Sequence, residues 1–316
     1  MKQAKNHLQH SSQLAAAVSI AAFLCGPSPA LATTILGTAE NFAILGGSTV
    51  TNTGPTTITG DLGLYPGTSY TGSGTVTLNG VTGGPGNITD AVALQAQHDN
   101  TTAYNILAGL SATATLTGDT LGSGGTVSLL HPGVYFFSSS AQLDGALTLD
   151  FQNLNGAVFV FQIGTTLTTA SASAIDVINP GTNDGIYFQV GSSATLGTTT
   201  AFEGNILALD SVTMTTDATI LCGRAFAQTG AVTMDTNTIS TGCSDTGYSG
   251  GSSNEFERLS RTVGNVPFTF AGTPTATSVP EPSTLALFGG GLLGLLGLAV
   301  RQRRVRLPQG SRQAIG

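Results

Sequence analysis

The sequence predicts a mainly β protein, a β-solenoid in which similar coils stack on one another beside one long α-helix. Short runs with alternating apolar and polar residues recur along the chain, as in strands that bury one face. The Thr-Leu and Thr-Met steps that begin at Thr195, Thr213 and Thr233 lie 18 and 20 residues apart. Glycine, serine and threonine, which favour turns, separate the runs. Such a repeat is typical of coils that bury their apolar side chains against the next coil.

The chain begins with the features of a secretory signal peptide, residues 1–32. Lys2 and Lys5 precede an apolar run, and the small-residue pattern Ala30-Leu31-Ala32 follows it. A basic region, an apolar region and an A-x-A cleavage site are the three parts of such a peptide. We therefore expect export, and a folded domain over residues 33–243.

In the first part of this domain, the sequence pattern predicts three short strands separated by glycine-containing turns: Phe42–Leu45, Ser48–Thr51 and Thr56–Thr59. A further alternating stretch, Thr71–Val81, follows them.

A single helix is predicted over residues 87–110. Asn87 is the expected N-cap, with Asp90 in the capping-box position three residues later. At about 1.5 Å per residue its length is about 33 Å, which spans about seven coils stacked about 4.8 Å apart. We expect the helix to lie along the flank of the stack and to cover one face.

In the later coils, threonines alternate with Leu196, Met214 and Met234. We expect these three apolar side chains to point inward, so the threonines beside them are predicted to form an outward column. Gly197 and Asp235 interrupt the column, and Gln142-Leu143-Asp144 is a degenerate member of the repeat. The candidate surface residues, including two from the first strands, are Thr166, Thr168, Thr195, Thr213, Thr215, Thr233, Thr49 and Thr51.

Two cysteines remain after the signal peptide, Cys222 and Cys243. In an exported protein they are expected to form a disulfide that joins the last coils, and two buried free thiols are the alternative. Neither their number nor their spacing makes a metal site, and no cofactor is expected. Residues 244–278 are rich in Gly, Ser, Thr and Pro and are expected to form a flexible linker.

The C-terminal part, residues 279–306, contains three features in order: Pro280-Glu281-Pro282, an apolar segment at 284–300, and an arginine cluster. The apolar segment is near the lower limit for crossing a bilayer, and the arginines and the tail at 307–316 would stay cytoplasmic. This arrangement resembles the PEP-CTERM sorting signal of Gram-negative bacteria. The resemblance implies an exosortase-type processing enzyme as a partner and transient inner-membrane anchoring before cleavage. The mature protein would then lie outside the cell or on its surface.

Charge is sparse in the part of the chain that would be exported. Between Thr33 and Pro280 there is no lysine, and the cations are Arg224, Arg258 and Arg261. The acidic balance leaves no basic patch, which argues against nucleic acid and anionic membrane surfaces as partners.

Several motifs of the folded part together resemble the microbial ice-binding (antifreeze-like) domain family. The resemblance covers about Gly37 to Cys243, and its motifs include Gly37–Leu45, Gly60–Gly63, Pro132–Tyr135, Val158–Gly164, Gln189–Ala194 and Gly204–Ala208. It implies a right-handed β-solenoid of roughly triangular cross-section with a long helix alongside. It also implies a protein, expected to be a monomer, that binds ice and inhibits its growth and recrystallisation.

Two other functions are alternatives to ice binding. An enzyme would need paired carboxylates or a placed base, but the histidines and carboxylates have no supporting motif: His98, His131, Asp61, Asp144, Asp150 and Asp176. We therefore expect no catalysis. A structural or adhesive protein of the cell surface or exopolysaccharide matrix is the main alternative, with exopolysaccharide as a further candidate partner.

Overall fold

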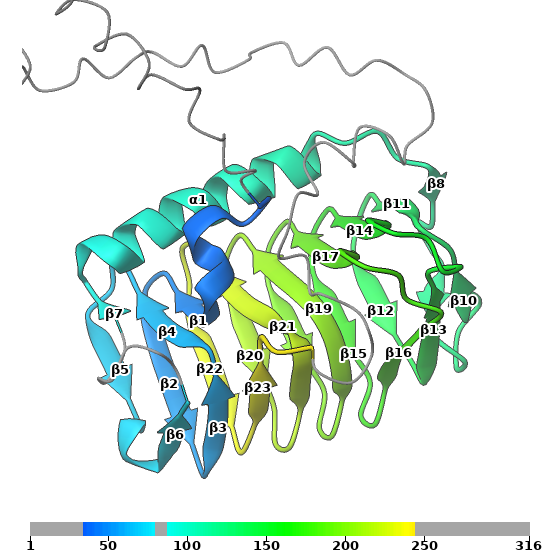
Figure 1. Ribbon diagram of the computed structural model, residues 1–316. Coiled ribbons are helices and arrows are strands. Elements are labelled where there is room, and N and C mark those ends of the chain that lie inside the picture. Colours follow the sequence, from blue (N-terminus) through cyan, green and yellow to red (C-terminus); the bar gives the residue numbers. More distant parts are fainter. Residues whose placement is uncertain (1–33, 80–86, 244–316) are drawn as a thin grey trace, which may run out of the picture. The chain divides into compact units, whose positions relative to one another are not determined.

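The computed structural model describes residues 34–79 and 87–243, which are mainly β, with one α-helix and two sheets (Figure 1). The strands pair in parallel throughout the stack. The predicted class, mainly β with one long helix, is therefore confirmed. The right-handed sense and the triangular cross-section stay predictions.

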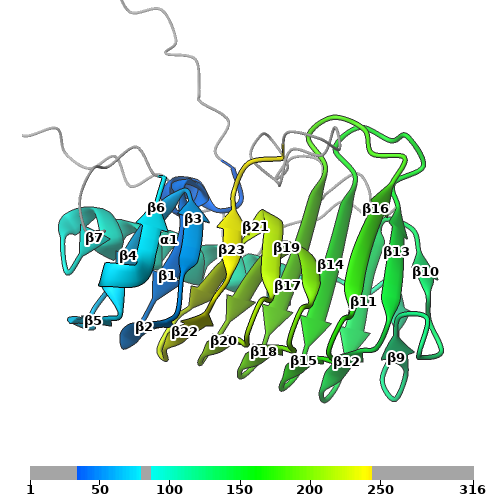
Figure 2. The ribbon, with the colours of Figure 1, turned by 90° about the horizontal axis from the view of Figure 1, so that it is seen from below.

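The strands form three ladders, and each coil of the chain adds one strand to each ladder (Figure 2). The helix-side ladder contains β8 (Ala114–Thr115), β11 (Gly133–Phe137), β14 (Val158–Ile163), β17 (Gly185–Val190), the second halves of β19 (Ala201–Ala208) and β21 (Thr219–Ala227), β1 (Phe42–Gly46), β4 (Asp61–Leu64) and β7 (Asn87–Ile88). The eight-stranded sheet contains β9 (Thr120–Leu121), β12 (Ala141–Leu143), β15 (Leu167–Thr169), β18 (Ala194–Leu196), β20 (Val212–Met214), β22 (Val232–Asp235), β2 (Thr49–Thr53) and β5 (Ser69–Thr71). The third ladder, whose outer side we call the third face, contains β10 (Leu129–Leu130), β13 (Ala146–Asp150), β16 (Ala174–Ile178), the first halves of β19 and β21, β23 (Thr238–Ser240), β3 (Thr56–Thr59) and β6 (Val76–Leu78). Two short 3-10 helices, η1 (Gly37–Asn41) and η2 (Ser73–Thr75), complete the elements.

The coils do not stack in chain order. The first coil, β1 to β3, pairs with the last coil, formed by β21, β22 and β23, so the two ends of the domain meet inside the stack. Figure 1 shows the blue N-terminal strands directly beside the yellow C-terminal ones. The chain then crosses to the far end of the stack, at β8, and winds back coil by coil.

The helix α1 (Ala91–Ala108) makes this crossing. Its N-cap is Asp90, whose side chain accepts a hydrogen bond from the Ala93 amide at 2.8 Å. The prediction of Asn87 as N-cap is wrong, because Asn87 and Ile88 instead extend the helix-side ladder as β7 and pair with β4. The remaining 18 residues give about 27 Å of helix, and Figure 1 shows α1 running from above β7 to the neighbourhood of β8.

Buried glutamines attach the helix to the strands beneath it. The Nε2 of Gln97 donates to the carbonyls of Gly46 and Ala227, at 2.9 and 3.0 Å, which belong to the first and last coils. At the other end of the helix, Gln162 Nε2 donates to the Leu107 carbonyl at 2.8 Å. Because the helix covers the helix-side ladder, all six residues of β14 are buried, which explains its continuous apolar run.

The interior is a column of stacked side chains. Phe161 and Phe188 occupy paired positions on adjacent coils, and their ring centroids lie 4.5 Å apart with an interplanar angle of 5°. Under the eight-stranded sheet, Leu196, Met214 and Met234 are fully buried, so their predicted inward orientation is confirmed. The buried apolar side chains of each coil thus pack against those of the adjacent coils.

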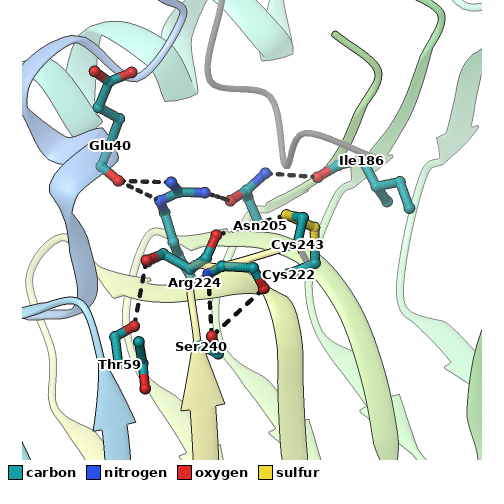
Figure 3. The surroundings of a disulfide bond; sticks show 10 residues. Glu40, Thr59, Ile186, Asn205, Cys222, Arg224, Ser240 and Cys243 are labelled. Carbon is teal, nitrogen blue, oxygen red and sulfur yellow. Dashed lines mark hydrogen bonds between the residues drawn. A yellow bond between two sulfur atoms is a disulfide. The ribbon is translucent and has the colours of Figure 1, made fainter. Parts of the chain in front are cut away.

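A buried arginine and a disulfide secure the junction between the two ends of the domain (Figure 3). Arg224 donates from Nε and Nη2 to the Glu40 carbonyl, at 2.9 and 2.6 Å, and from Nη1 to Asn205 Oδ1 at 2.8 Å. Cys222 and Cys243 form a disulfide, which ties β21 to the end of the described chain. The arginine therefore joins η1 to two of the last coils.

Several predicted segments lie outside the described residues. These are the signal peptide (1–32), the linker (244–278), the sorting signal (279–306) with its membrane segment (284–300), and the tail (307–316). Within residues 34–79 and 87–243, no helix is long and apolar enough to cross a membrane.

Candidate functional site

One outward position of the eight-stranded sheet carries threonine in seven of its eight strands. The pairing register joins these residues side by side into one row across the whole sheet. We call this row the central column, which in spatial order is Thr120, Gln142, Thr168, Thr195, Thr213, Thr233, Thr51 and Thr71. The column is continuous only because the N-terminal coils stack on the last coil, so that Thr51 lies next to Thr233.

Alternation within each short strand holds the central column outward. In β20, for example, Val212 and Met214 are buried on either side of Thr213, and β18 repeats this arrangement around Thr195. Threonine has a stiff χ1 torsion, so a row of strand threonines presents its methyls and hydroxyls in a fixed arrangement. Neighbouring coils lie about 4.8 Å apart, so the eight positions form a regular row about 34 Å long.

Small polar residues flank the central column on the side where the strands begin. Thr49 pairs with Ser69, and Thr166 Oγ1 donates to Ser140 Oγ at 3.0 Å on the adjacent coil. Two of the predicted surface residues, Thr49 and Thr166, therefore lie in this flanking row and not in the central column. We call the central column and its two flanking rows the threonine face.

The opposite flanking row contains the predicted interruptions. Gly197 and Asp235 lie two residues beyond Thr195 and Thr233, beside Thr215 and not within the central column. The expectation that they break the central row is therefore wrong, because alternation places them one position nearer the edge. Thr216 Oγ1 donates to Asp235 Oδ2 at 2.5 Å, so this carboxylate is hydrogen-bonded along the edge.

The edge beyond Thr215 is a stack of tight corners. Non-glycine residues there have left-handed backbone, with φ of 57° at Ala172, 56° at Thr199 and 60° at Asp217. Buried Asn237 donates from Nδ2 to the Thr215 carbonyl at 2.9 Å. Repeated corner geometry and hydrogen bonding of this kind hold successive coils in line and keep the face regular.

The other two sides of the stack differ from the threonine face. The helix covers the helix-side ladder, whereas the third face carries the carboxylates Asp150, Asp176 and Glu203 on its strands. The third face also exposes Leu129 and Leu221. The central column has no charged residue, and the carboxylate of Asp235 lies beside it in the flanking row, so ordered water over the central column itself would meet no ionic group.

Of the predicted surface residues, the structure brings five into the central column: Thr51, Thr168, Thr195, Thr213 and Thr233. Sequence reasoning missed Thr71 and Thr120 at the two ends of the sheet. The strands that carry them, β9 and β5, are only two and three residues long, which is too short for the alternating pattern to be recognised. Their pairing with the neighbouring strands was needed to find them.

The side chains considered for catalysis are dispersed. His98 is exposed on α1, whereas His131 lies next to β10, where its Nδ1 atom is 3.9 Å from Asp150 Oδ2 of β13. Hydrogen bonds from the Asn179 side chain and the Gln152 amide lower the pKa of Asp150, so this carboxylate is already engaged. Across the described ranges, no group of three or more His, Cys, Asp or Glu side chains is placed to hold a metal ion.

Comparison with protein families gives two matches on this chain. The Ice-binding-like family model matches residues 44–240, and the PEP-CTERM protein-sorting motif matches residues 278–304. The first match spans all three ladders and the whole central column.

Named relatives and solved structures agree with the family match. An ice-binding protein of Nostoc sp. (strain HG1) is 48% identical over 299 residues, which cover 94% of this chain and 98% of that protein. An ice-binding protein of Flavobacterium frigoris (strain PS1) is 35% identical over 218 residues, covering 65% of this chain and 75% of that protein.

Among solved structures, an ice-binding protein from an Antarctic biological consortium has 44% identity and a TM-score of 0.60, covering 67% of this chain and 93% of that chain. One from the Antarctic ascomycete Antarctomyces psychrotrophicus has 37% identity and a TM-score of 0.61, covering 67% and 100%. All four are named for binding ice and not for a reaction. This chain belongs to the Ice-binding-like family.

Proposed function

We propose that this protein adsorbs to ice through the threonine face and thereby restrains ice growth and recrystallisation. The observation that carries the proposal is the uncharged central column, which runs through all eight strands of the sheet with threonine at seven positions. Family membership and the names of the relatives support the same function.

The chemistry of the face suits ordered water. Outward residues two apart on a strand lie about 6.7 Å apart, and coils lie about 4.8 Å apart, so the face presents a two-dimensional lattice. Threonine methyls hydrate poorly, whereas the hydroxyls bind water by donating and accepting hydrogen bonds. Adsorption of this rigid lattice would pin the ice front and curve it between bound molecules. No covalent step and no cofactor is required.

Binding occurs over the whole area, so no single hydroxyl dominates. Thr71 Oγ1 donates to Thr51 Oγ1 at 3.3 Å, which shows how neighbouring threonines order one another at one end of the column. The proposed contact residues are the central column together with Thr49, Thr166 and Thr215 from the flanking rows. We also propose that the stack is a right-handed β-solenoid of triangular cross-section that acts as a monomer.

Location follows from the sorting motif. We propose that the chain is exported after removal of residues 1–32, is held transiently in the inner membrane by residues 284–300, and is then cut by an exosortase-type enzyme near Pro280. The match of residues 278–304 to the PEP-CTERM motif supports this route. Mass spectrometry of the extracellular protein tests it: a C-terminus near Pro280 is expected, and recovery of the intact C-terminal arginine cluster contradicts it.

An ice recrystallisation assay tests the function directly. Micromolar protein is expected to keep ice grains small during annealing below the melting point, while an equal concentration of heat-denatured protein leaves them to coarsen. Grain growth equal to that in buffer contradicts ice binding. That result would instead favour the cell-surface or exopolysaccharide-matrix role.

A further inference from the structure

One residue of the central column, Gln142, is not a threonine. It lies in β12 between two buried residues, so its side chain is exposed on the outer side of the sheet. The register pairs Gln142 with Thr120 on one side and with Thr168 on the other. Gln142 therefore separates Thr120 from the other threonines of the column. We call these others the threonine run, which in spatial order is Thr168, Thr195, Thr213, Thr233, Thr51 and Thr71.

Glutamine differs from threonine in length and in stiffness. The threonine side chain is branched at Cβ, which restricts χ1 and keeps its methyl and hydroxyl close to the sheet. Glutamine is longer and unbranched, and fixing its rotamers costs more conformational entropy. Its terminal amide carries donors and an acceptor that bind water farther from the sheet than the threonine hydroxyls do. A flat ice surface resting on the threonines would have to order or displace this amide, so contact at Gln142 is unfavourable.

The coil beyond Gln142 does not continue the lattice in a regular way. β9 contains only Thr120 and Leu121, and the loop that follows returns to Thr120. The Thr126 amide donates to the Thr120 carbonyl at 2.8 Å, and Thr126 Oγ1 donates to Asp119 Oδ1 at 2.9 Å. A tight loop and a carboxylate thus lie directly beside Thr120.

The opposite end of the column is regular. Thr71 pairs with Thr51 in the register, and its Oγ1 atom donates to Thr51 Oγ1 at 3.3 Å. On the same two strands, Ser69 continues the flanking row beside Thr49. Small, uncharged residues therefore extend the lattice to β5, the last strand of the sheet at this end. The two ends of the central column are unequal.

We propose that Gln142 limits the ice-binding area of the threonine face, so that the threonine run provides nearly all of the adsorption and Thr120 adds little. This role of Gln142 rests on the proposed adsorption to ice through the threonine face. Six coils about 4.8 Å apart make a contact row about 24 Å long, against about 34 Å for the full column. Gln142 thereby sets the strength of ice binding, because its replacement by threonine would join Thr120 to the run.

Gln142→Thr tests this limit by a gain of activity. The variant is expected to need roughly two- to threefold less protein than wild type for equal inhibition of ice recrystallisation, because its run of threonines is longer. Threonine is favoured on strands, so the variant is expected to keep its fold. Gln142→Asn keeps an amide and is the matched control, for which no such gain is expected. Activity of folded Gln142→Thr at or below that of wild type overturns the proposal, and so does an equal gain in Gln142→Asn, because the amide would then not be the obstacle.

Tyrosine substitutions at the two ends of the column give a second test that needs no gain of activity. Thr71→Tyr is expected to need roughly threefold more protein for the same effect, whereas Thr120→Tyr matches wild type. Thermal unfolding followed by circular dichroism checks that both variants are folded. Equal losses in the two variants overturn the proposal, since both ends would then contact ice. A wild-type protein without effect on ice grains contradicts the proposed function itself, whereas an active wild type with either comparison failed contradicts only the limit at Gln142.

Discussion

Replacing Arg224 by methionine is expected to loosen the joint between the two ends of the domain. Arg224 is 3% exposed, and its guanidinium donates to the Glu40 carbonyl and to Asn205 Oδ1. Asn205 in turn donates from Nδ2 to the Ile186 carbonyl at 3.0 Å, so the contacts reach a third coil (Figure 3). Methionine fills similar space but supplies none of these donors.

The size of the expected loss in the free energy of unfolding follows from the hydrogen bonds that the variant lacks. A hydrogen bond to a charged group contributes about 1.5–3 kcal/mol, and in the variant the buried Asn205 Oδ1 and the partly buried Glu40 carbonyl lose their donor. We therefore expect Arg224→Met to reduce the free energy of unfolding by about 3–5 kcal/mol, because each acceptor left without a donor costs about 1–3 kcal/mol. Total stability for a domain is about 5–15 kcal/mol, so the loss is large.

Urea denaturation followed by circular dichroism measures this change, with Arg224→Lys as the graded control. Lysine keeps the charge but not the planar set of donors, so its cost is expected to be intermediate, about 1–3 kcal/mol. A loss below about 1 kcal/mol for Arg224→Met would refute the role assigned to this joint. Because β2 and β5 belong to the N-terminal coils, a loosened joint is also expected to weaken ice activity through Thr51 and Thr71.

Two further predictions concern stability. Burial, and next the charge of Asp176, raises the pKa of Glu203 from 4.5 to about 7. The folded chain therefore binds this proton more tightly than the unfolded chain, so stability falls as pH rises from about 4.5 to about 7. Glu203→Gln is expected to flatten that fall in thermal unfolding curves and to add about 1–2 kcal/mol at pH 8 after allowance for solvent screening; an unchanged pH profile contradicts the assignment. Removing the disulfide with Cys222→Ser and Cys243→Ser is expected to cost about 3 kcal/mol, given the sequence separation of 21 residues, and equal urea midpoints for oxidised wild type and the double variant would refute this contribution.

Periodicity made the coils and their inner and outer sides predictable. Leu196, Met214 and Met234 were assigned inward because alternation in a strand fixes the side of each residue. The helix was predictable from its spacing, but its start was not. Asn87 and Asp90 are both good caps, and only the pairing of Asn87 with β4 decided between them.

The stacking order of the coils was beyond sequence reasoning. Ile44 pairs with Ala225, and nothing local in either strand specifies a partner so distant in the chain. The same non-local pairing determines the site, because it places Thr51 beside Thr233 and extends the column to Thr71. Sequence pattern therefore identified most of the threonines, but their assembly into one row required the fold.

The central claim is that the threonine face, and no other side of the stack, meets ice. The most direct test compares thermal hysteresis and recrystallisation inhibition for Thr213→Tyr, in the middle of the central column, with Thr238→Tyr on the third ladder. Both threonines point outward from parallel strands, so the two tyrosines add the same bulk to different faces. Thr213→Tyr is expected to need roughly tenfold more protein for the same effect, which corresponds to about 1.4 kcal/mol of lost adsorption energy, whereas Thr238→Tyr matches wild type. Full activity in Thr213→Tyr with loss in Thr238→Tyr, both variants being folded, would contradict the claim.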